Sequence, residues 1–338
     1  MARPKSTQLS LLDEVVAMDS REFPLLGYSL SEMTLAYLPK RRPRDTTRVY
    51  SHQNAGLTLT VTAGTDTADG GNIGLPYGPK ARLVIAKLNA VAVINKSPTI
   101  PLGASMNGFL SSLGLATSGG KKMSPRALVG EQVRRLVRCS LEFTWDKEKK
   151  NPDRDRGGAI RIAKYWDVWW DRSDNPTHPV DESVIVLSDD YFQALVGNPV
   201  PLNLEALQIL GHSALAMDLY AWLSSRLWRL QHPVHVTWPM LAVQFGTGPI
   251  PDDPRKRSRY LYDVKRDIED QMPTVLAVYH EAKVDSTPDG LLLKPSSPHV
   301  PPRGGHGLAR ARRQTTVPAR RFAAQVADRA QPSNTITA

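Results

Sequence analysis

The sequence predicts an α+β protein made of two tandem winged helix-turn-helix domains, with a flexible N-terminal leader and an arginine-rich C-terminal tail. Two observations predict this fold. The order helix, strand, helix, turn, helix, hairpin occurs twice along the chain, and it is the element order of a winged helix. The spacing also repeats, since Gly114 precedes Arg134 by twenty residues and Gly246 precedes Lys265 by nineteen.

The chain divides into four predicted parts. They are a leader over 1–69, a first winged helix over 70–180, a second over 181–298 and a basic tail over 299–338. The leader holds a short helical stretch, LLDEVVAM, a basic segment broken by proline, LPKRRPRDTTRVYSH, and an alternating strand, GLTLTVTAG. We expect its first 55 residues to be loosely structured and the leader to be partly disordered. The tail is poor in large apolar residues, so we expect it to be disordered or loosely helical.

The first domain opens with a predicted helix that has Pro79 near its start. A later helix begins at Ser124, a residue type that caps helices, followed by proline at the first helical position. Two alternating segments then predict a hairpin, the wing of the domain. In chain order the elements are a helix over 75–95, a strand over 97–103, a helix over 104–115, a helix over 124–140 and hairpin strands over 141–150 and 159–171.

The second domain follows the same order. Its most convincing helix is SALAMDLYAWLSSRLWRL, and its last one is strongly charged. An Asp-Gly turn between two apolar stretches predicts a second wing. The expected elements are a strand and helix over 183–197, a helix over 213–230, a strand over 234–238, a helix over 237–246, a charged helix over 252–270 and two strands over 274–296.

Composition favours an anionic partner, because the net charge is +10. The tail carries most of it: residues 301–338 hold seven arginines and one acid, which leaves about +4 for the other 300 residues. That excess would let the tail bind phosphate non-specifically. No apolar run is long enough to span a membrane, and the N-terminus lacks the apolar core of a secretory signal. The single cysteine, Cys139, excludes an internal disulfide and fits a core position in a cytoplasmic protein.

Helical wheels give both charged helices two faces. On the helix over 252–270, Arg259, Tyr262 and Arg266 lie within about 40° of Arg255, opposite an apolar stripe, although acids flank this face. Such a face is usually only solvated, but two such helices, each third in a winged-helix order, favour contact with a DNA groove. The predicted DNA-binding residues are Lys121, Lys122, Arg126, Arg134, Arg135 and Arg138 in the first domain, and Arg255, Lys256, Arg259, Tyr262, Lys265 and Arg266 in the second.

Other chemistry finds weaker support. A nicking enzyme would use a tyrosine nucleophile and a His-apolar-His metal site, which Tyr262 and the pair His232 and His235 suggest. Two residues separate these histidines, so on a strand their rings would point to opposite faces. There is no phosphate-binding loop. An aromatic group including Trp166 could stack bases but is more often core. We therefore predict no catalytic residue, no metal and no cofactor.

The chain resembles the plasmid-encoded RepA-type replication initiators over about residues 70–285. The motifs that carry the resemblance are LPYGPKARLVIAKLNAVAVINKSPTIPLGASMNGFLSSLGLATSGGKK, ALVGEQVRRLVRCSLEF, YWDVWW, VIVLSDDYFQAL, PLNLEAL and LAMDLYAWLSSRL. The resemblance implies a bacterial, cytoplasmic protein that binds repeated origin sequences (iterons) in double-stranded DNA, opens the adjacent AT-rich duplex and recruits the host initiator and replicative helicase. It also implies tandem winged helices and, often, a monomer–dimer balance that controls copy number. A transcription regulator with the same fold is the alternative.

Overall fold

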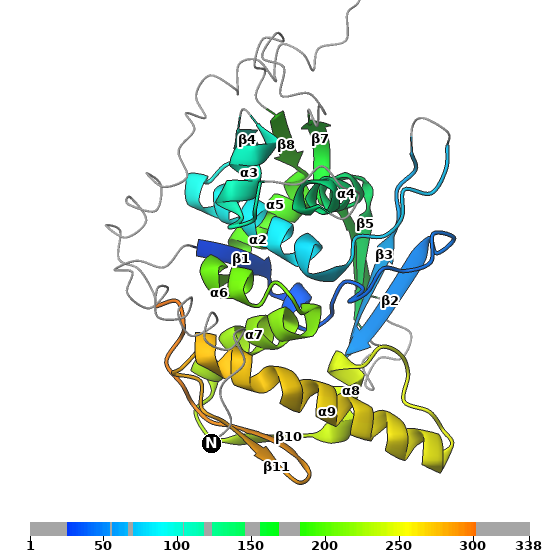
Figure 1. Cartoon of the computed structure of the whole chain (residues 1–338), viewed down its shortest axis with the longest axis vertical. Helices are drawn as coiled ribbons and strands as arrows, with labels where there is room; N and C mark the ends of the chain where they lie inside the picture. The colour runs from blue at the N-terminus through cyan, green and yellow to red at the C-terminus, as the bar shows by residue number, and fades with distance from the viewer. Residues whose placement is uncertain are drawn as a thin grey trace, which may run out of the picture.

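The computed structural model describes residues 26–54, 56–66, 70–103, 105–117, 124–145, 156–168 and 183–301. Helices and strands alternate irregularly through this part of the chain, so the predicted α+β class is confirmed (Figure 1). No helix among these residues combines the length and the apolar character needed to cross a bilayer. The helical stretch predicted near residue 15 and the arginine-rich tail lie outside the described residues.

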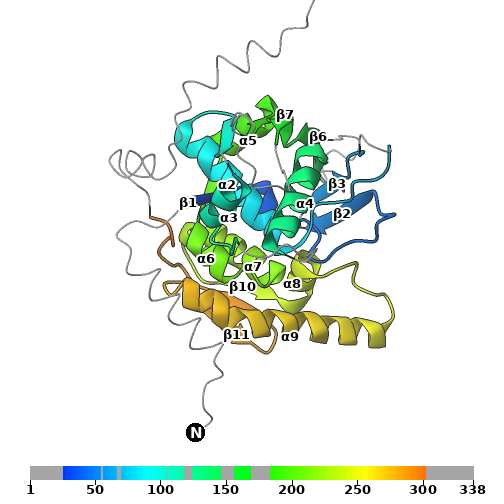
Figure 2. The same cartoon turned by 45° about the horizontal axis from the view of Figure 1, so that its top comes forward.

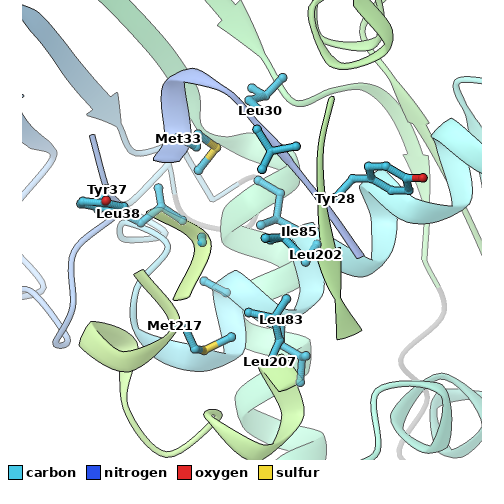
Figure 3. Packing of buried hydrophobic residues seen from close by; sticks show 14 of the residues in the cluster. Tyr28, Leu30, Met33, Tyr37, Leu38, Leu83, Ile85, Leu202, Leu207 and Met217 are labelled. Carbon is cyan, nitrogen blue, oxygen red and sulfur yellow. The ribbon is translucent and has the colours of Figure 1, made fainter. Parts of the chain in front are cut away.

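Helix α2 (Gly78–Asn95) is the centre of the core. Its sequence is apolar on all sides, and a helix of that kind is stable only when it is surrounded by protein. It packs against β1, α4, α6 and α7. Leu83 and Ile85 lie among buried side chains from β1, from the loop after it and from the second half of the chain (Figure 3).

Part of the predicted loose leader belongs to this core. Strand β1 (Leu26–Leu30) pairs antiparallel with β9 (Pro199–Asn203), and a short 3-10 helix, η1 (Glu32–Thr34), follows it. Tyr37 and Leu38 are almost fully buried. The expectation of a loose structure is therefore wrong for residues 26–38. The reason is that β1 pairs with a strand about 170 residues away, which no local pattern reveals.

The first half of the chain contains the predicted helices and hairpin. Ser124 caps α4 (Pro125–Arg138), as expected, with its hydroxyl accepting from the backbone N–H of Ala127 at 3.2 Å. The hairpin strands pair with each other, but they join two leader strands in the sheet β2-β3-β5-β6. The elements are β2 (Val49–Asn54), β3 (Leu57–Thr62), β4 (Thr99–Gly103), α3 (Met106–Ser112), β5 (Ser140–Trp145), β6 (Arg156–Arg161) and β7 (Ala163–Asp167).

Strand β8 (Ser183–Leu187) lies between β4 and β7 in a separate three-stranded sheet. It begins the second predicted domain in sequence but pairs with strands of the first. The division at residue 180 stays a prediction. After β8 the chain forms α5 (Asp189–Gly197), β9 and α6 (Leu204–Ile209), all of them within the second predicted domain.

The second half keeps the predicted order. The sheet β10-β12-β11 lies beside three helices, and α9 packs against α7 and α8. Helix α9 lies along one edge of the molecule, with its N-terminal end projecting past α8 (Figures 1 and 2). The elements are α7 (Ala214–Arg226), η2 (Leu227–Arg229), β10 (Val234–Thr237), α8 (Trp238–Phe245), α9 (Pro254–Val278), β11 (Val284–Thr287) and β12 (Gly290–Leu293).

The first strand of the predicted second wing begins later than expected. The sequence over 274–296 predicts two strands, but α9 continues through Pro273 to Val278, and the first of these strands, β11, begins at Val284. A proline inside a helix removes a hydrogen bond and costs roughly 3 kcal/mol. Here Met272, Val275 and Val278 extend the buried stripe of α9, and their burial offsets that cost.

A buried ion pair joins α2 to α7. The guanidinium of Arg82 donates to both carboxylate oxygens of Asp218, at 2.6 and 2.8 Å, and both residues are almost fully buried. Arg82 also donates to the backbone carbonyls of Leu38, Pro39 and Gly78. This pair therefore fixes the leader against both helices.

Candidate nucleic-acid interface

The start of α9 is defined by local sequence. Asp253 is the N-cap, and its carboxylate accepts from the backbone N–H of Lys256 at 2.8 Å. Pro254 occupies the first turn, where a missing N–H costs nothing. The helix therefore begins immediately before its most basic segment.

Charge is divided along α9. Residues 254–262 contain four basic residues and no acid, whereas residues 263–270 contain two basic residues and four acids. In the acidic stretch, Arg266 lies 3.2 Å from Asp263 and 2.9 Å from Asp267. Arg259 lies farther from its nearest acid, since its guanidinium is 3.9 Å from Asp263, at the limit of an ion pair. Positive charge that is available to an external anion therefore lies in the first two turns.

The predicted two-faced character of α9 is confirmed. Val264 and Ile268 are buried. Arg255 and Lys256 are exposed, as are Arg259, with 85% of its side chain accessible, and Tyr262, at 65%. These four side chains form an exposed face of the helix.

Lys265 lies to one side of that face. Its ammonium sits 5.2 Å from the ring centre of Trp238 and 3.9 Å from a carboxylate oxygen of Glu269. These contacts hold Lys265 against α8, so it lies beside the predicted contact face.

Trp238 on α8 and Glu269 on α9 also attach the wing to these two helices. The indole N–H of Trp238 donates to the backbone carbonyl of Pro288 in the β11–β12 turn at 2.9 Å. The hydroxyl of Ser286, on β11, donates to Glu269 at 2.7 Å. The positions of helix and wing are thus coupled. Neither Trp238 nor Glu269 is predictable from the sequence as a positioning residue, because their partners lie 50 and 17 residues away along the chain.

The loop before α9 is fixed by Tyr260, whose hydroxyl donates to the carbonyl of Gly248 at 2.7 Å. The phenol lies directly over Gly246, where a Cβ atom would come within 1.9 Å of the Tyr260 oxygen. Gly246 is required there because the backbone approaches this ring so closely. The loop therefore has a defined position beside the basic half of α9.

On α4, the prediction for Arg135 is wrong. Its side chain is buried, donating to the carbonyl of Leu75 at 2.8 Å and to Glu131 at 2.6 Å. Arg135 lies at the edge of the wheel's polar face, and these two partners hold it inside. Arg134 is exposed, and Arg126 is half-buried.

Arg138 is half-buried, with its guanidinium 5.0 Å from the ring centre of Trp166. Trp166 thus packs within the protein, in line with the expectation that this aromatic group belongs to the core. Tyr165 beside it is exposed. Lys121 and Lys122 lie outside the described residues. Of the first predicted set, Arg134 is the most accessible side chain that the structure describes.

The histidine pair forms no evident metal site. His235, on β10, lies 3.0 Å from the hydroxyl of Thr287 through its Nε2 atom. Among the described residues, no cluster of three or more His, Cys, Asp or Glu side chains could hold a metal ion. Cys139 is buried and free, and burial raises the pKa of its thiol to about 12.

Comparison with known proteins supports the resemblance drawn from the sequence. Residues 75–238 match the family described as plasmid encoded RepA protein, which confirms the RepA-type resemblance in this region. The matched region includes α4 and ends at the start of α8, so α9 lies beyond it. No curated protein sequence matches the chain significantly.

Two similar solved structures contain domains 2 and 3 of RctB. For one, the sequence identity is 14% and the TM-score 0.42, and the match covers 68% of this chain and 80% of the RctB chain. For the other, the identity is 12% and the TM-score 0.40, and the match covers 76% of this chain and 85% of the RctB chain.

Proposed function

We propose, from the membership of residues 75–238 in the plasmid encoded RepA family, that this protein is a plasmid replication initiator that binds repeated origin sequences in double-stranded DNA. The family match is the observation that carries the proposal. The basic half of α9 adds independent support, since it offers exposed positive charge on a helix that fits a major groove. The protein then acts through binding, without covalent chemistry.

Two winged helices are the proposed binding units. In the second half, α7, β10, α8, α9 and the β11–β12 hairpin have the order and pairing that such a unit needs. In the first half, α2, β4, α3 and α4 follow the same order, although the β5–β6 hairpin pairs with a leader strand. Helices α4 and α9 would enter successive major grooves, so one site spans about 20 base pairs.

Opening of the adjacent duplex follows from loading several copies on neighbouring repeats, because bending DNA stores energy that destabilises base pairs nearby. We further propose that the bound protein recruits the host initiator and the replicative helicase. A balance between monomer and homodimer would then limit the number of active copies.

Footprinting on the DNA that flanks the coding gene tests the proposal. Wild-type protein should protect direct repeats of about 20 base pairs. Replacing Arg255, Lys256 and Arg259 together by Gln should weaken binding at least 100-fold, since three contacts worth about 1–3 kcal/mol each are lost. The matched control R266Q should change affinity less than threefold, because Asp263 and Asp267 already neutralise Arg266.

Permanganate reactivity of thymines beside the repeats separates an initiator from a transcription regulator. An initiator should make thymines in an adjacent AT-rich segment reactive, whereas a regulator would bind without opening the duplex. Protection by the triple variant equal to that of wild type would exclude α9 as the contact. A wild-type protein that protects no repeat would refute the initiator assignment.

A further inference from the structure

The basic segment of the leader, residues 40–48, runs between the two candidate helices. It contains Lys40 and four arginines but a single acid, Asp45. In Figure 1 it is the blue chain that leads into β2. We expected this segment to be loose, yet hydrogen bonds fix it at both ends.

The inner end is attached to the core. The ammonium of Lys40 donates to the carbonyl of Phe245 at the end of α8. The backbone N–H of Gly78 donates to the carbonyl of Pro39 at 2.9 Å, next to the bond from Arg82 to Leu38. The segment therefore leaves the core at a defined position between α2 and α8.

The outer end is a closed turn. The N–H of Thr47 donates to the carbonyl of Arg44 at 2.8 Å. The amide of Asn72 donates to the carbonyls of Asp45 and Thr47, at 2.8 and 3.1 Å. The N–H of Ala63 donates to the carbonyl of Arg48 at 2.8 Å. These bonds restrict the backbone, so little conformational entropy is left to lose when the segment binds a ligand.

Adjacent residues of the segment face the two helices. Arg42 lies 3.8 Å from Glu131 of α4 and 3.1 Å from Asp45. Arg41 lines a cleft of about 500 Å³ together with Tyr260 and three acids of α9, Asp263, Asp267 and Asp270. The chain thus passes from the side of α9 to the side of α4 within two residues.

Three guanidinium groups of the segment are exposed and lie beyond ion-pair distance of any carboxylate in the described part of the chain. Arg41, Arg44 and Arg48 are exposed, and none makes an ion pair with another residue in the part of the chain that the structure describes. Arg42 differs, since its charge is shared with two acids. A fixed backbone that carries three unpaired arginines and runs between α4 and α9 has the properties of a phosphate-binding site.

We propose that residues 40–48 form a third contact with duplex DNA, in which Arg41, Arg44 and Arg48 bind backbone phosphates between the sites occupied by α4 and α9. This inference rests on the proposed function and specifies how the same surface continues between the helices. Phosphate contacts carry no sequence information, so this segment should add affinity and salt dependence without changing which repeat is preferred.

The test is the salt dependence of binding, measured by fluorescence anisotropy on a duplex with the footprinted repeat and on a scrambled duplex. Each lost phosphate contact reduces the slope of log affinity against log salt by about 0.9. The variant R41Q/R44Q/R48Q should therefore lower the slope by about 2.7 on both duplexes and keep their affinity ratio. The variant K96Q/R229Q/K283Q removes the same charge from exposed positions on other elements and should lower it by less than about 1.

The outcomes separate the two proposals. If wild type binds the repeat, R255Q/K256Q/R259Q loses binding and R41Q/R44Q/R48Q keeps the wild-type slope, the third contact is refuted while the proposed function stands. Equal slope changes in R41Q/R44Q/R48Q and K96Q/R229Q/K283Q would also refute the third contact, since net charge alone would then explain the effect. If wild type binds neither duplex, both proposals are wrong. Matching thermal unfolding curves establish that each variant is folded.

Discussion

The buried pair between Arg82 and Asp218 is the contact whose loss should cost the most stability. In D218N the shape of the side chain is kept but the negative charge is removed, so Arg82 remains buried and charged without a counter-ion. Removing one partner of a buried ion pair typically costs 3–5 kcal/mol. Arg82 keeps its bonds to three backbone carbonyls, which places the expected loss near the lower limit, at about 3 kcal/mol.

Urea unfolding followed by circular dichroism measures this loss of unfolding free energy directly. Thermal unfolding gives a second measure: a protein of this size shifts its melting temperature by about 2 °C per kcal/mol, so D218N should melt about 6 °C below wild type. The control is D189N, which breaks the ion pair between Lys164 and Asp189, 2.7 Å long but exposed. Exposed pairs contribute less than about 1 kcal/mol, so this variant should be close to wild type.

A loss below about 1 kcal/mol in D218N would contradict the reasoning, because it would mean that Arg82 finds other compensation. The double variant R82M/D218L removes both charges and tests the cause. It should be more stable than D218N, since no uncompensated charge remains, although the carbonyls of Leu38, Pro39 and Gly78 lose their donor. A double variant less stable than D218N would indicate that the carbonyl contacts, and not the ion pair, hold the leader in place.

Two further predictions concern single residues. Burial, with nearby Lys40, lowers the pKa of His52 to about 4, so from about pH 6.5 down to pH 4 the unfolded chain binds a proton that the folded chain does not. The free energy of unfolding of wild type should therefore fall by up to about 1.4 kcal/mol for each unit that the pH is lowered in this range. Urea unfolding of H52F should show a correspondingly weaker pH dependence. Identical pH profiles for wild type and H52F would refute this prediction. The variant G246A should lose about 1–3 kcal/mol of unfolding free energy, because its Cβ would displace Tyr260. The control G248A, whose Cβ meets nothing within 4 Å, should be as stable as wild type. Equal stabilities of the two variants in urea would contradict this prediction.

Local signals in the sequence predict most helices of this fold. Ser124 before a proline and Asp253 before Pro254 mark the starts of α4 and α9, because a cap acts within one turn. Long-range pairing carries no such signal. The strand β1 and its partner β9, and the joining of the β5–β6 hairpin to β3, depend on segments far apart in the chain. The start of the first wing strand was misplaced because the burial of Val275 and Val278 carries α9 past Pro273.

The candidate interface follows the same division. The outward face of α9 is predictable, because helical periodicity alone separates Arg259 and Tyr262 from Val264 and Ile268. Periodicity does not predict the burial of Arg135, whose partner Leu75 comes from another segment. Nor does it predict that residues 40–48 lie between the helices, since Phe245 and Asn72 fix their position from a distance.

The basic half of α9 is costly for the isolated protein. Arg255, Lys256, Arg257 and Arg259 occupy the first two turns, where the helix dipole is positive and each cation costs about 0.3–1 kcal/mol. Arg255 and Arg259 also repel each other at a spacing of four residues. Asp253 as N-cap offsets part of this cost, but none of residues 254–262 is acidic.

Binding of a polyanion removes these unfavourable interactions, and their removal adds to the binding free energy. Phosphates placed at this end interact favourably with the dipole and the four cations together, and the repulsion among the cations falls when they are neutralised. Binding DNA should therefore stabilise α9 as well as occupy it. The arrangement that weakens the free helix is the arrangement that a DNA-binding helix requires, and this favours a functional reading of the charge over simple solvation.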